Sequence, residues 1–270
     1  MRWRRPGERT GRSSSGLRRS RQRRASRRQS VGRRGRLGRE ALRTNAQSTK
    51  LRCGARLAKT VTRTLFDSDG PVDVEDAGLS ATYWAHAIGE PEASALLESL
   101  VGGTEWRQPE ISMFGRRVRI PRLTAWFGDS GASYVYSGIR NEPSPWSDPL
   151  RELRALVERL SGARFNSVLL NLYRTGEDHL SWHRDDEKEL GEQPTIASVS
   201  LGAERVFALR TANTDARKPT YNLKLEHGSL LVMRGATQRH WEHSVKKEPK
   251  IKEPRLNLTF RWVHSKDERT

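Results

Sequence analysis

The succession of short apolar segments that follows Gly162 is the feature that most constrains the fold of this 270-residue chain. Gly, Asn, Asp or Pro separates many of these segments, which is typical of strands joined by turns. Many short strands in succession indicate two packed sheets, as in a β-sandwich or jelly roll, for the main body of the chain. The segments span residues 167–173, 195–201, 205–209, 221–225, 229–233, 241–245 and 255–263.

Two helical segments precede these strands. Apolar residues recur at helical spacing between Pro91 and Val101, and again after Pro149 in a second segment that ends at Gly162. Asp148 is a candidate cap for the second helix. Helices followed by many strands predict the α+β class, with a β-core flanked by helices.

The basic residues of the chain are unevenly distributed. Residues 1–64 contain 22 Lys and Arg against 2 Asp and Glu, so they account for the net charge of +18. This Arg-, Ser- and Gly-rich composition buries too little apolar surface to offset the loss of chain entropy. We therefore predict a disordered tail over residues 1–63 and a folded domain over residues 64–270. The tail fits a nucleic-acid-binding arm, a targeting segment or an extension without function.

Cysteine content and hydropathy restrict the environment of the protein. Cys53 is the only cysteine, which excludes an intrachain disulfide and favours a reducing intracellular compartment. No apolar stretch has the length of about 18 residues that a membrane-spanning helix requires. The first residues also lack the apolar region of a secretory signal, so neither export nor membrane insertion is expected.

Two candidate metal ligands, His183 and Asp185, lie two positions apart. In an extended strand these side chains would point the same way, and either His240 or His243 could provide a third ligand. Two histidines and one carboxylate on one face of an octahedral ion leave three positions open, as in non-haem iron(II) oxygenases. The His-x-Asp pair alone is weak evidence, because such pairs occur often by chance and this one also fits a solvated, charge-rich turn.

The last apolar segment alternates between two kinds of side chain. Leu256, Leu258 and Phe260 would lie on one face of a strand, with two arginines, an asparagine and a threonine on the other. Such a polar face suits a dicarboxylate, because arginine pairs with carboxylates through two hydrogen bonds, although a surface strand shows the same alternation. Asn171 and Tyr173 repeat the pattern upstream. The polar face consists of Arg255, Asn257, Thr259 and Arg261.

From about Ser112 onward the chain resembles the AlkB family of nucleic-acid dealkylation oxygenases. The shared motifs are Asn171-x-Tyr173, His183-x-Asp185, His243-Ser244 and Arg255-x-Asn257-x-Thr259-x-Arg261. The subgroup that acts on double-stranded DNA is the most similar, through three further motifs. These are Phe114-Gly115, Tyr134-x-Tyr136-Ser137-Gly138 and His183-Arg184-Asp185-Asp186-Glu187.

The resemblance implies a double-stranded β-helix, or jelly roll, over about residues 164–263, with a nucleotide-recognition part over about residues 105–140. It implies that His183, Asp185 and His243 bind Fe(II), and that His240 is a strand residue near the site. 2-Oxoglutarate and O₂ are the implied co-substrates. The implied contacts of 2-oxoglutarate are Asn171, Tyr173, Arg255, Asn257, Thr259 and Arg261.

The resemblance further implies oxidative demethylation of N-alkylated bases, of the 1-methyladenine and 3-methylcytosine type, with release of formaldehyde and succinate. A base must leave the duplex to reach such a site, and Tyr136 and His183 would hold it. Tyr134 would lie near the same base. Asp186 and Glu187 would accept hydrogen bonds from its exocyclic amine, although they also fit a solvated acidic turn.

The segment around Phe114 has two interpretations. Phe114 could fill the gap that a flipped base leaves in the duplex, while Arg116 and Arg122 hold phosphates. The same segment also fits a hairpin with a buried phenylalanine.

Alkylated, double-stranded DNA is therefore the expected partner. We expect an intracellular monomer, in the cytoplasm or nucleoid of a bacterium or in the nucleus of a eukaryote. One alternative is an oxygenase that acts on RNA or protein. Another is a catalytically inactive protein that binds nucleic acid through its Arg-rich tail.

Overall fold

The computed structural model describes residues 59–61, 70–113, 115–132, 134–136, 139–212 and 220–265. In these ranges no helix combines the length and the hydropathy that crossing a bilayer requires. Nearly all of the predicted tail lies outside them. Its residues Lys59–Val61 are described and form strand β1, which pairs in parallel with β13 (Thr220–Leu225). This part of the predicted tail is therefore a strand, because β13 offers an unpaired edge.

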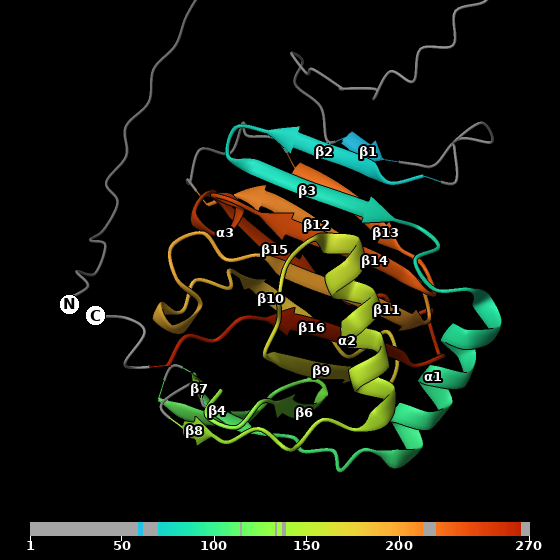
Figure 1. The fold of residues 1–270 in the computed structure, drawn as a ribbon. Coiled ribbons are helices and arrows are strands. Elements are labelled where there is room, and N and C mark those ends of the chain that lie inside the picture. Colours follow the sequence, from blue (N-terminus) through green and yellow to red (C-terminus); the bar gives the residue numbers. More distant parts are fainter. Residues whose placement is uncertain are drawn as a thin grey trace, which may run out of the picture. The chain divides into compact units, whose positions relative to one another are not determined.

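Two sheets form the main body of the described part (Figure 1). In both, strands distant in sequence are neighbours, as in a jelly roll. The five-stranded sheet has the order β1, β13, β12 (Arg205–Thr211), β15 (Trp241–Val245) and β10 (Leu180–His183). The seven-stranded sheet has the order β2 (Val72–Asp76), β3 (Leu79–Trp84), β14 (Ser229–Arg234), β11 (Ile196–Gly202), β16 (Arg255–Arg261), β9 (Ser167–Tyr173) and β6 (Leu123–Gly128).

Two hairpins accompany the sheets. Strands β4 (Glu110–Met113) and β5 (Arg116–Arg119) form the first, and β7 (Tyr134–Tyr136) and β8 (Ile139–Asn141) form the second. All seven strands predicted after Gly162 are present, with ends within two residues of the predicted ones. The predicted jelly-roll core of an α+β protein is thus confirmed.

Both predicted helices are present as α1 (Glu90–Gly103) and α2 (Asp148–Ser161). Gly162 follows α2 with a φ of 69°, the left-handed conformation that glycine adopts at helix ends. The cap prediction was wrong by one residue, because Ser147 is the N-cap and Asp148 begins the helix. Two short turns complete the elements: η1 (Lys188–Leu190) and α3 (Thr237–His240).

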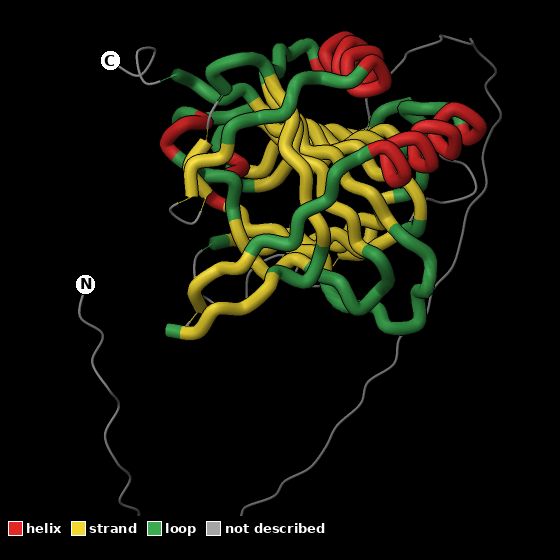
Figure 2. The backbone as a smooth tube through the Cα atoms, turned by 90° about the horizontal axis from the view of Figure 1, so that it is seen from below, coloured by secondary structure: helices red, strands yellow, loops and turns green. Residues whose placement is uncertain are grey.

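Two apolar clusters hold these layers together. The first lies between the helices and the outer face of the seven-stranded sheet, and contains Leu100 of α1, Val157 of α2 and Leu258 of β16. Both long helices accordingly lie to one side of the strands (Figure 2). The second cluster lies between the sheets and contains Leu209 of β12 and Met233 of β14. The inner face of the seven-stranded sheet is therefore turned toward the five-stranded sheet.

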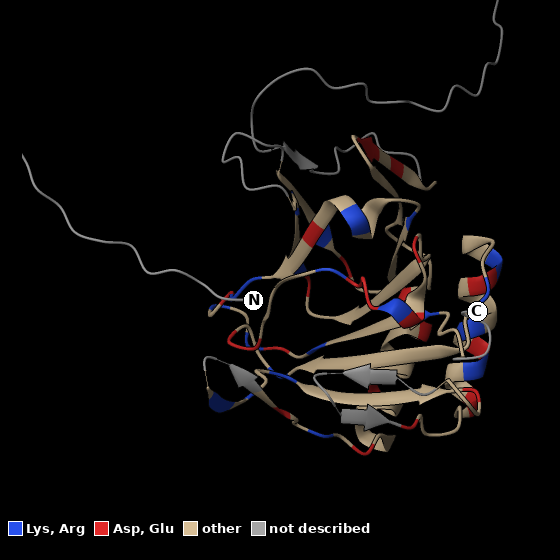
Figure 3. Ribbon diagram, turned by 90° about the vertical axis from the view of Figure 1, so that its left-hand side faces the viewer, with Lys and Arg blue, Asp and Glu red and all other residues tan. Residues whose placement is uncertain are grey.

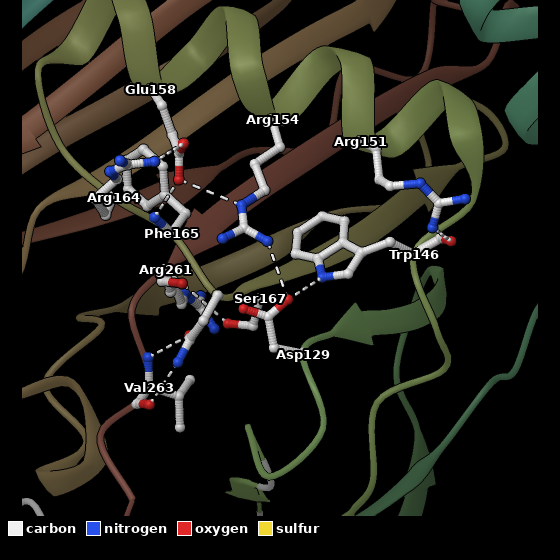
Figure 4. A network of polar contacts seen from close by, with 11 residues as sticks. Asp129, Trp146, Arg151, Arg154, Glu158, Arg164, Phe165, Ser167, Arg261 and Val263 are labelled. Carbon is white, nitrogen blue, oxygen red and sulfur yellow. Dashed lines mark hydrogen bonds and ion pairs between the residues drawn. The ribbon is translucent and has the colours of Figure 1, made fainter.

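A polar network ties α2 to the neighbouring loops (Figure 4). Asp129 Oδ1 accepts hydrogen bonds from Trp146 Nε1 at 2.8 Å and from Arg154 Nη1 at 3.0 Å. Glu158 Oε1 accepts from Arg154 Nε at 3.3 Å and from the backbone N–H of Phe165 at 2.9 Å. The network therefore fixes α2 beside the start of β9.

Charged residues of both signs are interspersed along α2 and in the connecting loops (Figure 3). This distribution agrees with the near balance of 28 basic and 30 acidic residues in residues 65–270.

Candidate metal and co-substrate site

A cavity of about 370 Å³ lies between the two sheets. The five-stranded sheet contributes His183 from β10 and His243 from β15 to its wall. The seven-stranded sheet contributes the polar face of β16 and Asn171 from β9. Alternation along β16 causes this, because its leucines and Phe260 belong to the cluster beneath the helices. Predicted metal ligands and predicted co-substrate contacts therefore line one cavity from opposite sheets.

His183, Asp185 and His243 lie close together. His183 and His243 are direct partners across β10 and β15, with ring centroids 4.1 Å apart. Asp185 Oδ1 is 3.9 Å from His183 Nε2, and one ligand atom of each residue lies within 4.8 Å of the others. Strand β10 ends at His183, so the expectation that one extended strand presents both His183 and Asp185 was wrong.

Tertiary contacts place Asp185 beyond the end of the strand. Its backbone N–H donates to Gln238 Oε1 at 3.0 Å, and its Oδ1 accepts from Arg261 Nη2 at 2.8 Å. Burial would raise the pKa of Asp185, but the positive charge of Arg261, followed by the charges that His243 and His183 carry when protonated, lowers it to about 2. The carboxylate is therefore ionised at neutral pH and suited to a metal ion.

Both histidine rings are held in place. His183 Nδ1 lies 2.9 Å from the carbonyl oxygen of Ser181, which leaves Nε2 directed at the site. The His243 ring stacks on Phe207 with centroids 5.1 Å apart. Burial, followed by the proximity of His183, lowers the pKa of His243 to about 3, so its ring is neutral. His240 ends α3, is exposed and is not part of the cluster.

These donors fit an iron(II) ion. Neutral imidazole and carboxylate ligands suit Fe(II), and three ligands leave positions for a co-substrate and O₂. His243 Nδ1 is buried without a hydrogen-bond partner among the described residues, as expected of a ring that awaits a ligand.

Arg255 and Tyr173 form the opposite end of the site. They are direct partners across β16 and β9, and the Arg255 guanidinium carbon is 5.2 Å from the Tyr173 ring centroid. Arg255 Nη2 donates to Ser200 Oγ at 2.9 Å. Within the described part of the chain, Arg255 Nε and Nη1 and the Tyr173 hydroxyl are buried without partners. Burial lowers the pKa of Arg255. These open donors fit a carboxylate.

The other polar side chains that line the cavity, together called the polar wall, are linked by hydrogen bonds. Asn257 Nδ2 donates to Ser198 Oγ at 2.7 Å, and Thr259 Oγ1 donates to Asn257 Oδ1 at 3.1 Å. Asn171 Oδ1 accepts from Arg122 Nε at 2.7 Å. These bonds hold each side chain at the cavity surface in one orientation, which suits recognition of a small polar ligand.

The sequence pattern of the 2OG-Fe(II) oxygenase superfamily matches residues 80–261, which contain the metal cluster and the polar wall. A bovine DNA oxidative demethylase ALKBH2 is 38% identical over 201 residues, which cover 72% of this chain and 72% of that protein. This chain belongs to the AlkB family of that superfamily. The family implies Fe(II), 2-oxoglutarate and O₂, the set predicted from the sequence.

Two other relatives of this AlkB-family chain match it over a smaller part of their own length. The human alpha-ketoglutarate-dependent dioxygenase alkB homolog 3 is 43% identical over 180 residues, or 64% of this chain and 62% of the relative. An Arabidopsis thaliana DNA oxidative demethylase ALKBH2 is 44% identical over 182 residues, covering 58% of each protein. The chain thus spans less than two thirds of the length of both.

Some residues of this AlkB-family chain that were predicted to contact DNA are exposed, and others line the cavity. Arg116 is exposed on β5, but Arg122 is only 6% exposed and lines the cavity beside Asn171. The phosphate contacts of both arginines remain predictions, although the burial of Arg122 and its hydrogen bond to Asn171 favour a place in the cavity wall over a phosphate contact. Glu187 lines the cavity, whereas Asp186 is exposed and pairs with Arg184 at 2.9 Å.

Three aromatic predictions remain predictions. Phe114 lies outside the described residues, although β4 and β5 on either side of it form the expected hairpin. The backbone of Tyr134 and Tyr136 forms β7, but their side chains lie outside the described part.

Several residues of the site were not predicted. Gln238 and Phe207 fix the metal cluster, and Arg205 lies behind Tyr173 with its guanidinium carbon 5.7 Å from the ring centroid. Ser198 and Ser200, which support the polar wall, alternate with apolar residues in β11. The alternation in β11 was the one sequence signal that could have identified any of these residues. Gln238, Phe207 and Arg205 gave no such signal, because they contact site residues that are distant in sequence.

Proposed function

We propose that this chain is an Fe(II)- and 2-oxoglutarate-dependent dioxygenase that removes alkyl groups from the nitrogen atoms of DNA bases. The observation that carries the proposal is the single cavity that joins His183, Asp185 and His243 to the open donors of Arg255 and Tyr173. Relatives named DNA oxidative demethylase support DNA as the substrate. An enzyme that acts on genomic DNA would be located in the same cellular compartment as the genome.

His183, Asp185 and His243 would hold the iron. Bound iron, with 2-oxoglutarate and O₂, would supply the oxidation of an N-methyl group, which leaves as formaldehyde while 2-oxoglutarate is converted to succinate and CO₂. Arg261 bonds to Asp185 and would hold this carboxylate in place while it also contacts the keto-acid end of 2-oxoglutarate. The protein thereby supplies geometry and a site shielded from water.

Arg255 and Tyr173 would bind the distal carboxylate of 2-oxoglutarate. Their open donors are buried, so a carboxylate there would replace missing hydrogen bonds and offset the cost of buried positive charge. Asn171, Asn257 and Thr259 would contact the same molecule along the polar wall.

A flipped base would enter beside His183, with Tyr134 and Tyr136 near it and Phe114 in the gap that it leaves. Glu187 lines the cavity, so it is better placed than the exposed Asp186 to accept a hydrogen bond from a base inside. An acidic group favours a cationic alkylated base over a neutral one.

The test is demethylation of 1-methyladenine in duplex and single-stranded oligonucleotides, with and without Fe(II) and 2-oxoglutarate. We expect repair only with both present, and no repair by the His183→Ala variant. Metal-dependent turnover on methylated RNA or peptides alone would replace DNA as the substrate. A wild-type protein that binds DNA but releases no succinate with any substrate would be a binding protein instead.

The duplex preference needs its own test. Phe114→Ala should slow the repair of duplex more than that of single strands, because a wedge is needed only where a base leaves a stack. An equal effect on both substrates would favour the hairpin with a buried phenylalanine.

A further inference from the structure

Arg205, the first residue of β12, is the most deeply buried charge that the proposed chemistry does not use. Only 1% of it is exposed, yet it is absent from the cavity wall. A buried arginine is costly unless its hydrogen bonds are made. Arg205 makes them with two loops that are far apart in sequence.

Each loop provides acceptors. From the loop after β9, the carbonyl oxygens of Asp178 and Thr175 accept from Arg205 Nη2 at 3.0 Å and Nη1 at 3.4 Å. From the loop before β16, the Lys246 carbonyl accepts from Nη2, and Glu248 Oε1 accepts from Nε at 3.2 Å. Arg205 therefore links the two loops.

The loops also bond directly to each other. Gly176 N–H donates to the Ile251 carbonyl at 2.9 Å, and Glu248 N–H donates to the Gly176 carbonyl at 2.8 Å. A Cβ atom on Gly176 would lie 1.8 Å from the Glu248 carbonyl oxygen, so only glycine allows this approach.

The linked loops begin and end at the co-substrate pocket. Tyr173 is the last residue of β9 and Arg255 the first of β16, and the two face each other in the sheet. The Arg205 and Arg255 guanidinium carbons lie 5.7 Å and 5.2 Å from the Tyr173 ring centroid. Movement of Arg205 would therefore disturb both residues that present open donors.

We propose that Arg205 is a positioning residue for the distal carboxylate of 2-oxoglutarate, an inference that rests on the proposed function. The guanidinium group of Arg205 bonds to both loops and holds them so that Tyr173 and Arg255 keep the spacing that a carboxylate requires. Glu248 compensates the charge of Arg205, which leaves the charge of Arg255 available to the distal carboxylate. Lysine cannot replace Arg205 fully, because a single ammonium group cannot reach four acceptors in a plane.

The experiment measures anaerobic binding of 2-oxoglutarate to Mn(II)-loaded full-length protein by calorimetry, together with Mn(II) affinity and steady-state kinetics. For Arg205→Gln we expect both constants for this co-substrate, Kd and KM, to rise about tenfold or more, the size typical of residues that orient a ligand-binding group. Mn(II) affinity and kcat at a saturating co-substrate concentration should stay within about twofold of wild type. Arg205→Lys should fall between Arg205→Gln and wild type.

Arg210→Gln is the matched control. Arg210 lies on the same strand and pairs with Glu242 at 2.7 Å, but it is exposed and packs on Trp182 outside the cavity. This variant should bind 2-oxoglutarate like wild type. If Arg205→Gln does not fold, Glu248→Gln is the second variant, and we expect it to bind 2-oxoglutarate severalfold more weakly than wild type.

Three outcomes would overturn the inference. One is an unchanged Kd in a folded Arg205→Gln or, failing that, Glu248→Gln variant. Another is an equal loss of Mn(II) affinity, kcat and 2-oxoglutarate affinity, which indicates a general structural role. The third is a wild-type protein that binds no 2-oxoglutarate, which would refute the proposed function on which the inference rests.

Discussion

The backbone N–H of Asp185 donates a hydrogen bond to Gln238 Oε1 at 3.0 Å, inside the protein. Gln238 is 1% exposed, and its Nε2 lies 3.5 Å from Met233 Sδ of β14. A candidate metal ligand that follows the end of its strand is thus anchored to the opposite sheet through one amide side chain.

Gln238→Met should weaken metal binding. The substitution keeps the length of the side chain but removes the acceptor, so the buried Asp185 N–H loses its partner. We expect about tenfold to hundredfold lower affinity for Mn(II) or Co(II), measured by titration of the full-length protein. Arg239→Gln, at the next and exposed position, is the control. Equal affinities for both variants would show that this hydrogen bond does not position Asp185.

Substitution of the two neighbouring histidines should have opposite results. His243→Ala removes a buried ring of the candidate metal cluster, and we expect loss of Co(II) binding in visible absorption titrations. His240→Ala changes an exposed ring outside the cluster and should leave the titration as in wild type. The ligand assignment would be wrong if His240→Ala were the variant that lost the metal.

The loop after β9 should show a pH-dependent stability. Asp178 accepts hydrogen bonds from the backbone N–H, Nε and Nη2 of Arg174 at 2.9, 2.8 and 2.9 Å. Burial would raise the pKa of Asp178, but the hydrogen bonds from Arg174 outweigh burial and lower it below the usual 3.8. A lowered folded-state pKa stabilises the protein above the unfolded-state pKa, and this contribution disappears as the pH falls through the folded-state value.

Asp178→Asn should therefore lower the free energy of unfolding at pH 7 by roughly 2 kcal/mol, the size of a charge-assisted hydrogen bond. The difference from wild type should begin to shrink below about pH 4, where Asp178 of the unfolded wild-type chain takes up a proton, and should disappear as the pH falls through the lower folded-state pKa. Urea denaturation between pH 7 and pH 3 measures both. A difference that stays constant over this range would contradict the ionic role of Asp178.

The contacts of Glu158 in Figure 4 should matter for stability alone. Glu158 accepts hydrogen bonds from Arg154, Arg164 and the backbone of Phe165, on the helix side of the seven-stranded sheet. Glu158→Ala should cost about 1–3 kcal/mol in unfolding free energy, because a buried N–H loses its acceptor. Glu152→Ala, on an exposed turn of the same helix, is the control. Weaker 2-oxoglutarate binding by folded Glu158→Ala would contradict this separation of roles.

Period-two patterns made much of the fold predictable. The alternation in residues 255–261 assigned each residue of β16 to a face, because neighbouring side chains of any strand point to opposite sides. The seven strands after Gly162 were found for the same local reason. Strands β2, β3 and β6 were missed, since they depend on pairing with β14 and β9 rather than on a strong pattern of their own.

The amino-acid sequence by itself determined seven strands of the jelly roll, the polar face of β16 and the types of residue that could bind iron and a dicarboxylate. Tertiary structure alone decided that Asp185 meets the two histidines from beyond its strand and that Arg122 is buried against Asn171. It also brings His243 beside His183, as the family resemblance implied. Local patterns depend on backbone geometry between neighbours in the chain. The site depends on hydrogen bonds and packing between segments that only the folded sheets bring together.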